Sequence, residues 1–145
     1  DADLQTMPEE FTRLIDNIDG YAMALGIRTG RKDTVHKKLQ SKIGNGFRRM
    51  MTGDGALDTG CPLKLIRTSY AKRLPMFNGM HRFIPALIML QEGGSYCQVP
   101  VTHCPRTSGK SKFNMWNRLR GFTDCFVFRW MRRNYVDFDS AESNL

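Results

Sequence analysis

The sequence lacks any long hydrophobic run. Its longest unbroken apolar stretch, Phe83 to Leu90, contains Pro85 and is far shorter than the ~20 residues that a helix needs to cross a bilayer. Residue 1 is Asp rather than Met, and no charged segment followed by an apolar one comes after it. We expect no membrane span in these residues, and a natural start that lies elsewhere or has been removed.

Cysteines at metal-binding spacing are also missing. The four cysteines form no Cys-x-x-Cys pair and have no neighbouring histidine at zinc-finger spacing. They are Cys61, Cys97, Cys104 and Cys125. Reduced, structural thiols in a cytosolic setting are the favoured interpretation.

Acidic residues are scarce in two stretches of an otherwise mixed chain. The 22 Lys and Arg residues outnumber 14 Asp and Glu, giving a formal charge of +8. Residues 28–50 hold eight basic residues against Asp33, and residues 102–133 hold eight against Asp124. This balance favours polyanionic partners such as nucleic acid, anionic lipid headgroups or diphosphates, without choosing among them.

What is present suits one folded domain of mixed α/β structure. Hydrophobic residues make up 41% of 145, enough for a real core. Strands are expected at Tyr21 to Ile27, within Asp58 to Thr68, and at Tyr96 to His103. Helices are expected from Met7 to Gly20, Thr34 to Met51, Ser69 to Leu74, Met80 to Gln91, and Phe113 to Tyr135.

Helical spacing also gives each of the three amphipathic helices an apolar face, which is expected to be buried in the first helix and either packed in the core or resting in a lipid headgroup layer in the other two. In the first, the apolar stripe is Phe11, Leu14, Ile15 and Ile18. In the second, it is Val35, Leu39, Ile43, Phe47 and Met50, opposite Lys37, Lys38, Lys42, Arg48 and Arg49. In the last, it is Trp116, Leu119, Phe122, Phe126 and Trp130.

The opening Asp1-Ala2-Asp3-Leu4-Gln5 could bind a divalent cation. At a strand end, residues i, i+2 and i+4 point the same way, so Asp1, Asp3 and Gln5 could converge on one Mg²⁺ or Mn²⁺ ion. Such a cation would neutralise a leaving diphosphate. Taken alone the motif is weak, because similar triplets also cap helices and fill solvent loops.

Five further motifs follow that opening in order. They are Gly-x-Arg-x-x-Arg at Gly26 to Arg31, Ser41 with Asn45, Asp58-x-Gly60-Cys61, His81-Arg82-Phe83-Ile84-Pro85, and His103-x-Pro-Arg106-x-x-Gly109-x-Ser111-Lys112. In this order and spacing the chain resembles the family-2, GT-A-type glycosyltransferases of the polyprenyl-phosphate (dolichol-phosphate mannosyltransferase-like) group. The resemblance covers nearly the whole chain and begins at the family's Asp-x-Asp motif.

The resemblance implies a fold and a reaction. The fold would be a partial GT-A, Rossmann-like domain over residues 1–136, the acceptor-side half with a mixed sheet and amphipathic helices, followed by an acidic tail at 137–145. Asp1, Asp3 and Gln5 would hold Mg²⁺ or Mn²⁺ on the diphosphate of a nucleotide-sugar donor, GDP-mannose or a UDP-sugar. A polyprenyl-phosphate acceptor would attack with inversion at the sugar carbon.

Basic loops would supply the phosphate contacts, because guanidinium groups bind phosphate in bidentate fashion. Asp58 would orient an arginine or the acceptor, or cap a turn. A loop around Gly109 would close over the donor phosphates. The candidate ligands of the acceptor phosphate are Arg28, Arg31, Lys37 and Ser41. The residues of the closing loop that would contact phosphate are Arg106, Ser111 and Lys112, and Arg82 is a further phosphate ligand. The catalytic candidates are Asp58 and Arg106.

The expected location is peripheral, at the cytoplasmic inner face of the membrane. The helices at 34–51 and 113–135 could rest on the membrane surface, and a membrane-anchoring subunit could assist; no nucleic-acid partner is expected. Relatives carry an N-terminal half that this chain does not contain, so these 145 residues alone should have little or no activity. Alternatives are a glycan or glycolipid hydroxyl acceptor, or a non-catalytic basic module that binds lipid or nucleic acid.

Overall fold

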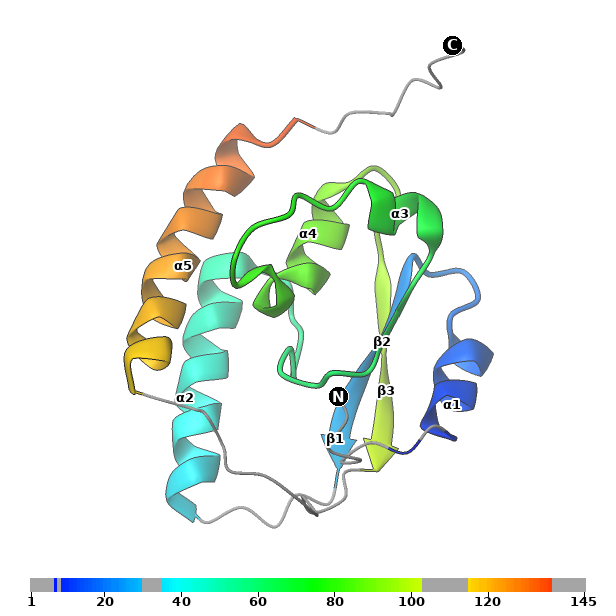
Figure 1. Cartoon of the computed structure of the whole chain (residues 1–145), viewed down its shortest axis with the longest axis horizontal. Helices are drawn as coiled ribbons and strands as arrows, with labels where there is room; N and C mark the ends of the chain where they lie inside the picture. Colours follow the sequence, from blue (N-terminus) through cyan, green and yellow to red (C-terminus); the bar gives the residue numbers. More distant parts are fainter. Residues whose placement is uncertain (1–6, 8, 30–34, 103–114, 137–145) are drawn as a thin grey trace.

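The computed structural model describes residues 7, 9–29, 35–102 and 115–136 (Figure 1). The predicted α/β composition is confirmed. In chain order the elements are α1 (Glu10–Asn17), β1 (Met23–Thr29), α2 (Val35–Thr52), β2 (Lys64–Ile66), α3 (Thr68–Lys72), the 3-10 turn η1 (Met80–Arg82), α4 (Ile84–Leu90), β3 (Tyr96–Thr102) and α5 (Met115–Asn134).

β1 is the central strand of a three-stranded mixed sheet with the order β2-β1-β3. It runs antiparallel to β2 and parallel to β3, where Met23 pairs with Tyr96 and Thr29 with Thr102. A strand covered on both faces must be apolar on both, and the first three residues of β1 are fully buried. Arg28 therefore lies near the end of the best-protected strand of the sheet.

One face of the sheet is covered by α1, through fewer residues than its sequence predicts. Leu14 is fully buried, whereas Phe11 and Ile15 of the predicted stripe are 47% and 57% exposed, which corrects that prediction. The buried line instead runs through Glu10, Leu14 and the partly buried Ile18, because this helix of only two turns packs on the sheet through one narrow face. Its core cluster contains Leu14, Ala24, Cys61, Leu63, Val99 and Val101.

The other face of the sheet is covered by α4, which lies between the sheet and the pair α2 and α5 (Figure 1). Ile88 packs toward the sheet, while Phe83 and Leu87 pack toward α2 and α5. The single helix predicted over Met80 to Gln91 is wrong in its first part. The chain forms η1, breaks at Phe83, and starts α4 with Pro85 in its first turn, where a residue without an N–H is tolerated.

The apolar face of α2 lies largely outside the core, which disagrees with the core-packing alternative for this helix. Leu39, Ile43 and Met50 are 54%, 61% and 69% exposed, whereas Arg48 is only 6% exposed and Met51 is 7% exposed. α2 lies beside α5 and joins the core only near its C-terminal end, so the direction of burial follows its neighbours there (Figure 1).

Part of the aromatic side of α5 also lies outside the core. Phe126 and Trp130 are 60% and 68% exposed, while Cys125 and Phe128 are buried. The side chains of the first residues of α5, including Trp116, lie outside the described side chains. Among the helices of the described ranges, none is both long and apolar enough to cross a membrane.

Candidate functional site

The end of β1 carries a bidentate ion pair. Arg28 Nε donates to Asp58 Oδ2 and Arg28 Nη2 donates to Asp58 Oδ1, both at 2.7 Å, and the Arg28 backbone N–H lies 3.3 Å from Oδ2. The two side chains are only 16% and 13% exposed. Of the three interpretations considered for Asp58, contact with an arginine is the one seen in the structure. Such a fork fixes the plane of the guanidinium as well as its position.

Two glycines allow the Arg28 strand and the Asp58 segment to approach closely. A Cβ on Gly60 would lie 3.0 Å from Arg28 Nη2. A Cβ on Gly26 would lie 3.0 Å from Cys61 Sγ and 3.1 Å from the Leu63 carbonyl oxygen, tighter than ordinary contacts. The Gly-x-Arg and Asp-x-Gly-Cys motifs, thirty residues apart in the chain, therefore pack against each other.

Lys64 belongs to the same neighbourhood, although its sequence position did not single it out. The half-buried side chain donates from Nζ to the Cys61 carbonyl, and it faces the α4 side of the sheet, like its cross-strand partner Leu25. Burial lowers the pKa of Lys64, an effect that nearby Cys61 and Asp58 partly oppose. The sequence feature that could have identified Lys64 is its position three residues after the Asp-x-Gly-Cys motif.

The turn η1 adds two more polar side chains near β2. Burial, together with the charges of Arg82 and Lys64, lowers the pKa of His81, which favours a neutral imidazole. Arg82 itself donates from Nη1 to Asp124 Oδ2 of α5 at 3.2 Å. Arg82 thus ties η1 to α5.

The remaining predicted residues fall in two groups. Ser41 is exposed on α2, where its hydroxyl accepts a 3.4 Å hydrogen bond from Asn45 Nδ2. Lys37 lies in α2 one turn earlier, with its side chain outside the described residues. The other predicted ligands also lie outside the described residues: Asp1, Asp3, Gln5, Arg31, Arg106, Ser111 and Lys112. Within the described ranges, no three His, Cys, Asp or Glu side chains gather as a metal site would require.

The arrangement suits the binding of an anion. Arg28 and Lys64 carry two positive charges against the single carboxylate of Asp58, in surroundings where partial burial strengthens electrostatic interactions. A guanidinium held by a carboxylate also needs little reorganisation when a ligand arrives.

Known proteins resemble this chain over most of its length. It is 34% identical over 120 residues to the undecaprenyl-phosphate 4-deoxy-4-formamido-L-arabinose transferase of Edwardsiella ictaluri, an alignment that covers 79% of this chain and 35% of that relative. It is 31% identical over 137 residues to the dodecaprenyl-phosphate galacturonate synthase of Rhizobium johnstonii, an alignment that covers 92% of this chain and 40% of that relative. The chain thus spans little more than a third of the length of these curated relatives. No family model and no solved structure matches it.

Proposed function

Because this chain belongs to the polyprenyl-phosphate glycosyltransferases of family 2, we propose that it is the acceptor-side part of such an enzyme. The reaction is transfer of a sugar, with inversion, from a nucleotide-sugar such as GDP-mannose or a UDP-sugar to a polyprenyl phosphate. The observation that carries the proposal is the Arg28–Asp58 fork at the end of β1, which joins two of the motifs on which the resemblance to that family rests.

The chemistry of a phosphate acceptor matches what these side chains offer. A phosphate is already anionic at neutral pH, so its attack on a sugar carbon has less need of a strong general base than attack by an alcohol. Positioning and charge neutralisation then dominate the catalytic task. Arg28 supplies an oriented positive charge, and Lys64 adds a second one within electrostatic range of it.

A divalent cation completes the proposal. Asp1, Asp3 and Gln5 offer the oxygen ligands that Mg²⁺ and Mn²⁺ prefer, and the cation would neutralise the leaving diphosphate. Arg106, Ser111 and Lys112 would contact the donor phosphates, and Arg31, Lys37, Ser41 and Arg82 remain further phosphate-binding candidates.

Binding of a short-chain prenyl phosphate, measured by titration calorimetry, tests the acceptor assignment. We expect the phosphate to bind and the prenyl alcohol of equal length to bind at least tenfold more weakly, because charge-assisted hydrogen bonds are worth roughly 1.5–3 kcal/mol. Arg28→Gln should remove this preference. The control is Arg13→Gln, at an arginine whose side chain is 59% exposed on α1. Equal binding of alcohol and phosphate, or an unaffected Arg28→Gln, would refute the assignment.

We further propose that α2 and α5 rest on the cytoplasmic surface of the membrane. Exposed apolar residues at helical spacing, Leu39 and Ile43 on α2 and Phe126 and Trp130 on α5, flank the partly buried Phe47. The Phe47 ring lies 6.1 Å from that of Phe126, so the two apolar edges are continuous. Basic residues lie on the same two helices, which favours anionic lipid: Lys42, Arg49, Arg129 and Arg133.

Vesicle co-sedimentation tests this surface. We expect binding to vesicles that contain phosphatidylglycerol, weaker binding to purely zwitterionic vesicles, and loss of binding in Phe126→Asp. The matched control is Ile15→Asp, at an equally exposed apolar residue of α1. Equal losses in both variants would count against a membrane face at α2 and α5. A separate membrane-anchoring subunit stays a prediction.

A further inference from the structure

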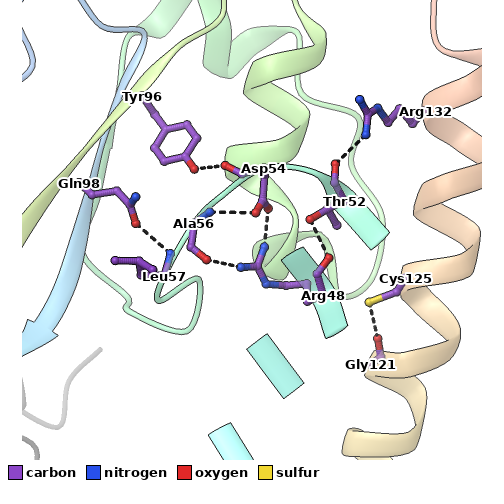
Figure 2. A network of polar contacts seen from close by, with 10 residues as sticks. All are labelled: Arg48, Thr52, Asp54, Ala56, Leu57, Tyr96, Gln98, Gly121, Cys125 and Arg132. Carbon is purple, nitrogen blue, oxygen red and sulfur yellow. Dashed lines mark hydrogen bonds and ion pairs between the residues drawn. The ribbon is translucent and has the colours of Figure 1, made fainter. Parts of the chain in front are cut away.

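A buried ion pair holds the turn that precedes Asp58 (Figure 2). Arg48 of α2 is 6% exposed and Asp54 is 4% exposed. Arg48 donates from Nη1 to the Asp54 carboxylate and from Nη2 to the Ala56 carbonyl, and Asp54 Oδ1 accepts a 3.0 Å hydrogen bond from the Ala56 backbone N–H. The Arg48 guanidinium and the Asp54 carboxylate thus bind the carbonyl and the N–H of the same residue, Ala56.

β3 holds this turn from the opposite side. The Tyr96 hydroxyl donates to the Asp54 carbonyl, and Gln98 Oε1 accepts a 2.8 Å hydrogen bond from the Leu57 backbone N–H (Figure 2). The turn needs such anchoring, because Gly53 and Gly55 have φ of 69° and 68° and glycine backbones are conformationally free.

The anchored turn ends immediately before the carboxylate that holds Arg28. Leu57 is tied to β3 through its N–H, and the next residue, Asp58, forms the fork to Arg28. Any shift of the turn relative to β1 must therefore change the geometry of that fork.

Stability alone does not account for burying this pair. Buried ion pairs lose hydration that their mutual attraction often does not recover, and apolar replacements of similar size are commonly as stable. In the part of the chain that the structure describes, the buried Arg48 Nε also has no hydrogen-bond partner. The conformation that the ion pair imposes on the turn from Gly53 to Leu57 is the better account of why these charges lie inside the protein.

We propose that Arg48 and Asp54 are positioning residues for the acceptor-phosphate site. Their ion pair fixes the turn from Gly53 to Leu57, so that Asp58 holds Arg28 in the orientation that binds the phosphate. This inference rests on the proposed function of Arg28.

Asp54→Asn tests the inference, because asparagine keeps the oxygen that accepts from Ala56 but loses the charge that attracts Arg48. In the 145-residue chain, we expect the dissociation constant for a short-chain prenyl phosphate to rise about tenfold. We also expect the Arg28 Nε–H resonance in a ¹H–¹⁵N spectrum, assigned through Arg28→Lys, to shift toward that of a solvent-exposed arginine. The matched control is Asp19→Asn, at a 99% exposed carboxylate, which should change neither readout.

The double variant Arg48→Met/Asp54→Asn keeps the test decisive if Asp54→Asn folds poorly, because it leaves no unpaired buried charge. Weakened phosphate binding by this folded variant supports the inference. Wild-type affinity together with an unshifted Arg28 resonance, in either variant, overturns it. If Arg28→Gln itself leaves phosphate affinity unchanged, the proposed function fails; if only Arg28→Gln weakens binding, the function stands and the positioning role does not.

Discussion

Burying a lysine within electrostatic range of an arginine disfavours the folded state. Burial lowers the pKa of Lys64, so the charged form is less favourable in the folded chain than in the unfolded one. Below that lowered pKa, folding carries the full desolvation penalty of the ammonium group. As pH rises from the lowered pKa toward the ordinary 10.5, the unfolded chain binds more protons and stability rises.

Lys64→Met should therefore separate binding from stability. We expect weaker binding of prenyl phosphate, while the free energy of unfolding at pH 7 falls by no more than about 1 kcal/mol, because the lost hydrogen bond and the relieved desolvation oppose each other. Calorimetry and urea denaturation measure the two effects, with the exposed Lys72→Met as the control. A large loss of stability with unchanged phosphate binding would contradict a role in the site.

Tyr96 predicts a pH dependence of the opposite sign. Burial, reinforced by the negative charge of Asp54, raises its pKa to about 12 from the ordinary 10.0. The folded protein retains the phenolic proton longer, so this stabilising contribution is complete below pH 10 and is lost as pH approaches about 12.

Tyr96→Phe should thus be less stable than wild type by about 1 kcal/mol at pH 8, through loss of the hydrogen bond to the Asp54 carbonyl. That deficit should shrink at pH 11, because the wild type has by then lost part of the same contribution. Urea denaturation at both pH values measures it, with Tyr21→Phe, at a 41% exposed side chain, as the control. A deficit that is equal at both pH values would contradict the assignment.

Residue types in short motifs predicted part of the site, and tertiary contacts decided the rest. Arg28 and Asp58 were identified from their motifs, and their contact was one of the alternatives for Asp58. Lys64 was not identified from the sequence, because a lysine in a short strand usually lies in solvent. Arg48 was placed on the basic face of its helix, whereas the ion pair with Asp54, from the turn beyond the helix, holds it in a buried position.

Helices and strands were located well because their signals are local. Periodicity and the positions of Gly and Pro placed nearly every element within a few residues. The faces they bury were predicted less well, since burial depends on neighbours far away in the chain. α2 shows this most clearly, with an apolar stripe that remains exposed along Leu39, Ile43 and Met50.

Two glycines in and just after α2 differ in backbone conformation and in their surroundings, so their substitution tests how this helix ends. Gly53 has φ of 69°, and a Cβ there would lie 2.8 Å from Arg132 Nη1, which itself donates a 3.0 Å hydrogen bond to the Thr52 carbonyl. Gly44 lies inside the helix, with nothing within 4 Å of a Cβ.

Gly53→Ala should lower the free energy of unfolding by roughly 1–2 kcal/mol, because an alanine in the left-handed region is strained. Gly44→Ala should raise it by up to about 1 kcal/mol, because alanine has the higher helix propensity. Thermal and urea unfolding of both variants measure the difference. The same sign for both substitutions would show that this helix end is not built as described.

The whole molecule is a layered arrangement in which α1, the sheet, α4 and the pair α2 and α5 follow one another (Figure 1). The α/β class and the family were predicted from motifs in collinear order. The stacking of the layers was not predicted, because it depends on contacts between segments that no local pattern links. One such contact is Phe83 on Phe128, with ring centroids 5.1 Å apart.

At this scale, we expect the 145 residues alone to transfer little or no sugar, because they span only 35% and 40% of the length of two curated relatives. Single-turnover assays with radiolabelled GDP-mannose or UDP-sugars, undecaprenyl phosphate and Mg²⁺ or Mn²⁺ measure this. Robust turnover by the isolated chain would contradict the expectation. Phosphate binding without turnover would agree with it.

The parallel pairing of β1 with β3 also bears on how the protein acquires its structure. Their paired residues lie about 70 positions apart, so joining them closes a long loop, and such closures slow folding. Among the strands of the described residues, β2 is the first that β1 can pair with during synthesis. The sheet that presents Arg28 is therefore complete only after β3 has been synthesised, and the apolar surface of β1 needs protection until then.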